Sequence, residues 1–149
     1  MIGRERGRVP GMRFALIADE VRVAIDSDAD IVSARQKGRG LASQCGFPST
    51  DLAVVATAIS ELARNIVRYA VRGEVILRLI DDNGRRGVEV VATDDGPGIP
   101  DIALAMQDGY STSGSLGLGL PGVRRLMDEF EIASDFGKGT TVTVRKWKR

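Results

Sequence analysis

The sequence has no histidine and only one cysteine among its 149 residues. Without histidine, it has no Ser-His-Asp triad, no histidine zinc ligand and no phosphohistidine. The single thiol, Cys45, forms no internal disulfide, which is typical of proteins from a reducing compartment. Long apolar runs are also missing, because the longest, LAVVATAI, is far too short for a membrane span. We therefore expect a cytoplasmic protein that binds no membrane.

Positive and negative charges are nearly balanced. The formal net charge is +1, and hydrophobic residues make up 43% of the chain, as in an ordinary globular domain. With two tyrosines and one tryptophan, stacking on nucleic-acid bases is poorly supported, so we expect no nucleic-acid partner. The basic residues gather at the two ends, where they predict solvated tails: Arg4, Arg6, Arg8, Arg13, Arg145, Lys146, Lys148 and Arg149.

Residues 1–17 are rich in glycine and arginine and show no hydrophobic period. The short apolar stretch FALIA is followed at once by Asp19 and Glu20, which argues against a signal peptide. We expect a disordered N-terminal extension over 1–17, with Met12 as another initiator, and one domain over 18–149.

The hydrophobic pattern alternates between strands and helices. Two-residue alternation predicts strands at 20–26, 74–81, 87–94, 131–136 and 140–147. Apolar stripes with helical spacing predict a helix ended by Gly46, a second ended by Gly73, a short one at 102–106 and one from about 118–121 to 129. The fold class is therefore α/β, in the form of an α+β two-layer sandwich. Its helices cover one face of a mixed, mostly antiparallel sheet.

Three segments carry candidate chemistry, and the first is ISELARNI at 59–66. Glu61 and Asn65 are four residues apart on a helix, so their side chains point the same way. A carboxylate beside an amide carbonyl offers one oxygen for Mg²⁺ and one to accept a proton from a hydroxyl. An ordinary polar helix edge, with Glu61 paired to Arg64 or Arg68, explains the same pattern.

The second segment, DDGPGIPD at 94–101, follows a strand. Asp94 could accept the amino group of adenine, and Gly96 and Gly98 would let the backbone approach a flat ligand. A simple Asp-Gly-Pro-Gly turn is the alternative.

The third segment is STSGSLGLGLPGVRRL at 111–126. Gly114, Gly117 and Gly119 precede an amphipathic helix, and free backbone N–H groups at a helix start favour phosphates. The polar stretch before them could close over a nucleotide as a lid. A flexible loop explains the same composition.

The order of these motifs, with the Gly-x-Gly-Thr hairpin at 137–140, resembles the ATP-binding domain of the GHKL superfamily, which includes gyrase, histidine kinases and MutL. The match spans about residues 20–147. It implies the Bergerat fold with ATP and Mg²⁺ as cofactors. Glu61 would be the catalytic base, Asn65 the magnesium ligand and Asp94 the reader of adenine. Gly96 and Gly98 would line the base pocket, and Thr140 would support the Asp94 site or its water. Gly117, Leu118, Gly119 and Leu120 would hold the phosphates.

Within this superfamily, the sequence looks like the small, stand-alone switch kinases of the RsbT type. Such kinases phosphorylate serine or threonine on STAS-domain proteins (RsbS/RsbR-like) and, once released, activate a PP2C-type phosphatase (RsbU-like). Ser115 stands where the usual phosphate motif has its first glycine, which leaves the geometry of the lid open. An anti-sigma factor kinase of the RsbW or SpoIIAB type, or a non-catalytic nucleotide-gated binding module, are the alternatives.

Overall fold

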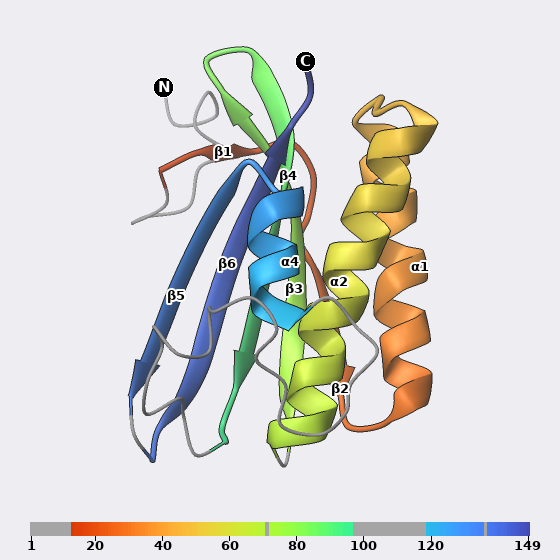
Figure 1. Ribbon diagram of the computed structural model, residues 1–149. Coiled ribbons are helices and arrows are strands. Elements are labelled where there is room, and N and C mark those ends of the chain that lie inside the picture. The colour runs from red at the N-terminus through yellow and green to blue at the C-terminus, as the bar shows by residue number, and fades with distance from the viewer. Residues whose placement is uncertain (1–12, 71, 97–118, 136) are drawn as a thin grey trace.

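The protein folds as one antiparallel sheet with its helices on one face (Figure 1). The computed structural model describes residues 13–70, 72–96, 119–135 and 137–149. The described helices are α1 (Asp28–Gln44), α2 (Ser49–Tyr69) and α4 (Gly119–Leu126). The described strands are β1 (Ala15–Leu16), β2 (Val21–Ile25), β3 (Gly73–Asp82), β4 (Arg85–Asp94), β5 (Glu129–Asp135) and β6 (Gly139–Trp147).

The strands follow the order β1-β3-β4-β6-β5, and β2 also pairs with β3. Every pairing among these described strands is antiparallel, which confirms the predicted two-layer fold with a mostly antiparallel sheet. A two-residue turn joins β3 to β4. Its central residues, Asn83 (φ 53°) and Gly84 (φ 91°), both have positive φ, as the Asn-Gly pair predicts.

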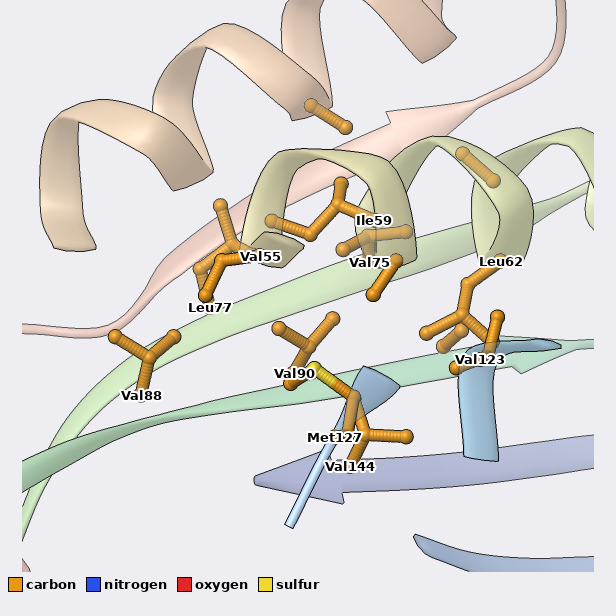
Figure 2. Close-up of a cluster of buried hydrophobic side chains, with 14 of the residues drawn as sticks. Val55, Ile59, Leu62, Val75, Leu77, Val88, Val90, Val123, Met127 and Val144 are labelled. Atoms are coloured by element: carbon orange, nitrogen blue, oxygen red, sulfur yellow. The ribbon is translucent and has the colours of Figure 1, made fainter. Parts of the chain in front are cut away.

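The core lies between the sheet and the helices (Figure 2). Alternate residues of the central strands point at the helices, because successive side chains of a strand face opposite ways. Val75, Val90 and Val144 are fully buried there. They meet the apolar stripe of α2, and full burial of one such side chain contributes about 1.5–3 kcal/mol. The labelled residues of this cluster are Val55, Ile59, Leu62, Val75, Leu77, Val88, Val90, Val123, Met127 and Val144.

The two long helices lie side by side because α1 carries a glycine at their contact. A Cβ atom at Gly38 would overlap Cδ1 of Ile59 on α2. None of the described helices is both long enough and apolar enough to span a membrane.

Two predicted boundaries were wrong. Helix α2 ends at Tyr69, and Gly73 is the first residue of β3 rather than the residue that stops the helix. Helix α4 ends at Leu126, and Glu129 already pairs with Arg145 in β5. Both shifts have the same physical reason, since cross-strand pairing extends a strand beyond its hydrophobic alternation. The predicted short helix at 102–106 lies outside the described residues.

Residues 13–17, expected to belong to a disordered extension, include a strand of the sheet. Ala15 pairs with Asp81, and the ring of Phe14 packs edge-on against Trp147, with 5.2 Å between centroids. Phe14 is buried together with Ile80 and Trp147 on the face of the sheet away from the helices. This apolar contact accounts for the order of a segment that has no hydrophobic period of its own.

Candidate functional site

One row of residues crosses four strands where β4 ends. Cross-strand pairing aligns Gly73 of β3, Asp94 of β4, Thr140 of β6 and Ser134 of β5. Asp94 and Thr140 face the same side of the sheet as the buried Ala92 and Val142, which is the helix side. The row therefore brings a carboxylate and two hydroxyls to the layer between sheet and helices.

Hydrogen bonds fix the polar groups of this row. The carboxylate Oδ1 of Asp94 accepts the backbone N–H of Gly96 at 2.9 Å. The hydroxyl oxygens of Ser134 and Thr140 are 2.9 Å apart, and the Ser134 hydroxyl also lies 3.2 Å from the carbonyl oxygen of Gly139. The second carboxylate oxygen of Asp94 has no hydrogen bond within the described part of the chain, so it can accept one from a ligand.

Glycines allow the backbone to approach closely at this end of the sheet. A Cβ atom on Gly139 would overlap the carbonyl oxygen of Asp94. A Cβ atom on Gly96 would lie 3.0 Å from the Tyr69 carbonyl oxygen at the end of α2. Asp94 and Gly96 therefore sit against the C-terminal end of α2.

The other half of the site lies on α2 itself. Glu61 is 7% exposed, and its Oε1 receives a hydrogen bond from Nη1 of Arg64 at 2.6 Å. Its Oε2 accepts the backbone N–H of Gly119 at 3.4 Å, although the two residues are 58 apart in sequence. Glu61 thus lies at the start of α4. Its pairing with Arg64, the alternative foreseen from sequence, is also present.

Asn65 lies between the two halves. It is half-buried one helical turn after Glu61, and one turn before Tyr69, whose carbonyl is next to Gly96. The α2 helix therefore lines up the proposed base, the amide and the Asp94 end of the site along one side.

The start of α4 is suited to an anion. Gly119 has a φ of +68°, which only glycine adopts easily, and Leu120 behind it is buried. The N-terminal N–H groups and the helix dipole both favour negative charge there. Gly98, Gly117 and Leu118, also predicted to bind nucleotide, lie outside the described residues.

The donor set fits the groups that the sequence resemblance implies. The amide oxygen of Asn65, beside the carboxylate of Glu61, is a hard oxygen ligand of the kind Mg²⁺ prefers. Across the described ranges, no three or more Cys, Asp or Glu side chains form a metal cage.

Sequence reasoning missed two residues of this site. Ser134 joins it because the hairpin between β5 and β6 sets it opposite Thr140. The available signal was its position two residues after Ile132, which packs against the core, because residues two apart in a strand face the same side. Arg64 was seen only as a possible surface partner of Glu61.

Comparison with known proteins identifies the family. The model of the histidine kinase-like ATPase domain matches residues 19–146, so the chain belongs to this family. The match confirms the resemblance to the GHKL superfamily.

Among relatives, the chain is 52% identical over 131 residues to the serine/threonine-protein kinase RsbT of Bacillus subtilis (strain 168). That alignment covers 88% of this chain and 98% of the relative. The chain is also 34% identical over 107 residues to the anti-sigma F factor of Geobacillus stearothermophilus, covering 66% of this chain and 72% of that protein.

Two solved structures share the fold. The structure of the RsbU and RsbW domains of Rv1364c from Mycobacterium tuberculosis matches with a TM-score of 0.62 and 23% identity, over 87% of this chain and 32% of that one. The mycobacterial sensor histidine kinase MprB matches with a TM-score of 0.53 and 16% identity, over 89% and 99% of the two chains. Both likenesses support the predicted fold.

Proposed function

We propose that this protein is a serine/threonine-protein kinase that transfers the γ-phosphoryl group of Mg-ATP to a partner protein. The observation that carries the proposal is the carboxylate of Glu61 held at the N-terminus of α4. A proton acceptor at an anion-binding helix start is what transfer to a hydroxyl needs. The 52% identity to a serine/threonine-protein kinase supports the same activity.

Nucleotide binding divides between the two halves of the site. Asp94 accepts the exocyclic amino group of adenine, which favours ATP over GTP because guanine carries an oxygen there. Gly96, Gly98 and Thr140 line the base pocket, and Ser134 orients the Thr140 hydroxyl. The backbone N–H groups of Gly117, Leu118, Gly119 and Leu120 hold the phosphates.

For catalysis, the residues of this chain position the reacting groups and help to neutralise the charge on the phosphates. Asn65 holds Mg²⁺, which when bound neutralises charge on the phosphates. Glu61 accepts the proton of the substrate hydroxyl while the hydroxyl oxygen bonds to the γ-phosphorus, and the bond to the β-phosphate oxygen breaks to leave ADP.

The partner class follows from the resemblance. We propose a STAS-domain protein (RsbS/RsbR-like) as substrate and, after its phosphorylation, a PP2C-type phosphatase (RsbU-like) as the second partner. A cytoplasmic location suits both.

An anti-sigma factor kinase is the second candidate. It is favoured by the similarity to anti-sigma F factors, which reaches 34% identity. Capture of a sigma factor rather than a STAS-domain protein by the immobilised chain would support this candidate over the first.

The first experiment is transfer of labelled γ-phosphate from Mg-ATP to a purified STAS-domain protein, with Glu61→Ala beside the wild type. We expect label on the partner with the wild type only. Binding of ATP without any transfer would contradict the kinase assignment and favour a nucleotide-gated binding module.

A further inference from the structure

The carboxylate of Glu61 is held from two sides by unequal bonds. Oε1 lies 2.6 Å from Nη1 of Arg64, a short bond between opposite charges. Oε2 lies 3.4 Å from the N–H of Gly119, near the outer limit for a hydrogen bond. The strong partner therefore fixes one oxygen, and the other can exchange its weak partner.

The surroundings of the two charges also differ. The side chain of Glu61 is 9% exposed, whereas that of Arg64 is 36% exposed. Arg64 follows Glu61 by three residues on α2, so the two lie on the same side of the helix. The guanidinium therefore reaches the buried carboxylate from the solvent side, and Gly119 faces it from α4.

We propose that Arg64 is a positioning residue for phosphoryl transfer. By binding Oε1, it fixes the rotation of the Glu61 carboxylate and leaves Oε2 as the oxygen that takes the proton of the substrate hydroxyl. This inference rests on the proposed role of Glu61 as the base. Precise placement matters because a displacement of about 1 Å of a catalytic group can lower a rate about 100-fold.

A purely stabilising ion pair is the simpler explanation, and it has different consequences. Pairs three residues apart on a helix, with one partner partly exposed, contribute little to stability. Removal of such a pair would leave turnover unchanged. A positioning role instead predicts a loss of kcat with little change in the KM for ATP.

The experiment compares Arg64→Ala, Arg64→Lys and the control Arg39→Ala in the full chain. Arg39 is exposed on α1, which is away from α4. For Arg64→Ala we expect kcat to fall about 10- to 100-fold, with KM for ATP and the midpoint of thermal unfolding close to wild type. Arg64→Lys should recover part of the rate, and added guanidinium ion should partly restore Arg64→Ala, while Arg39→Ala stays at the wild-type rate.

Glu61→Gln tests whether Arg64 acts through Glu61. If it does, Arg64→Ala should add no further loss in the Glu61→Gln background. An unchanged kcat in Arg64→Ala, a loss that is additive with Glu61→Gln, or a matching rise in KM would overturn the inference. Wild-type turnover by Glu61→Gln would show that Glu61 is not the base, and this would overturn the inference as well. ATP binding without transfer by the wild type would instead contradict the kinase function itself, so the two failures can be told apart.

Discussion

Asp94 and Thr140 are direct cross-strand partners at the end of β4, and both face the helices. The Thr140 hydroxyl is bonded to Ser134, while the Asp94 carboxylate accepts the N–H of Gly96. A strand end thus presents an acceptor and an oriented hydroxyl side by side. We propose that these groups read adenine.

Asp94→Asn should weaken ATP binding about 10-fold or more, because a hydrogen bond to a charged group contributes about 1.5–3 kcal/mol. The fold should persist, since the amide oxygen of asparagine can still accept the Gly96 N–H. Isothermal titration with ATP measures the change. Asp51→Asn, in the first turn of α2, is the control. An unchanged affinity for ATP would mean that Asp94 serves another purpose.

Asn65→Ala should lose Mg²⁺-dependent phosphoryl transfer by about 100-fold, because charge neutralisation by a metal supplies several kcal/mol to the transition state. Asn65→Asp keeps a hard oxygen and should retain more activity. Chelation of Mg²⁺ should stop the wild type to a similar degree. Normal transfer by Asn65→Ala across a titration of Mg²⁺ would exclude this residue as the ligand.

Ser134→Ala removes a hydroxyl that is bonded to Thr140 and near the Gly139 carbonyl. We expect a loss of about 1 kcal/mol in the free energy of unfolding, the usual contribution of one hydrogen bond. If Ser134 orients Thr140, the double variant with Thr140→Ala should bind ATP no more weakly than Thr140→Ala alone. Urea unfolding and ATP titration provide the two measurements, and additive losses in ATP binding would contradict the coupling.

Gly139→Ala and Gly137→Ala separate backbone strain from steric overlap. Both glycines have positive φ, 101° and 79°, so both substitutions should cost about 1 kcal/mol in strain. Only the Cβ atom at position 139 meets another atom, the Asp94 carbonyl, whereas nothing lies within 4 Å at position 137. Gly139→Ala should therefore be the more destabilising by a further 1 kcal/mol or more in urea unfolding. Equal losses would show that the strands can separate at Asp94.

Glu20 links stability to pH. Hydrogen bonds from Arg78 and then Arg22 lower the pKa of the Glu20 carboxyl below its ordinary value of 4.5. Its stabilising contribution is therefore present above the pKa of the unfolded chain and is lost as the pH falls through the lower, folded value. Because these side chains are partly exposed, the contribution should stay below about 1 kcal/mol.

Glu20→Gln should be slightly less stable than the wild type at pH 7, and the difference should be smaller at pH 3. Urea unfolding at both pH values tests this. Glu131→Gln, which removes a more exposed carboxylate paired with Arg145, is the comparison variant. A difference that grows at low pH would reverse the assigned direction of the pKa shift.

Among the described elements, the sequence by itself determined the helices and strands from β2 to β6 and their order, but not β1. The apolar stripes of α1 and α2, the Asn83-Gly84 turn and the strand alternation are local patterns. A local pattern can be recognised in the sequence without knowing which element packs against it. Boundaries at Gly73 and Glu129 were wrong because strand pairing, which is not local, extends β3 and β5. Residues 13–17 were misjudged for the same reason, since their order comes from contact with Trp147 and β3.

Motif spacing also indicated Glu61, Asn65 and Asp94, because Glu61 and Asn65 share a side of one helix and Asp94 ends a strand. Only the tertiary structure decided that Glu61 meets Gly119, 58 residues away, and that Ser134 stands opposite Thr140. It also selected Arg64 over Arg68 as the partner of Glu61. A sequence fixes which groups can interact along one element, but the packing of α4 against α2 and the register of β5 on β6 determine which groups actually meet.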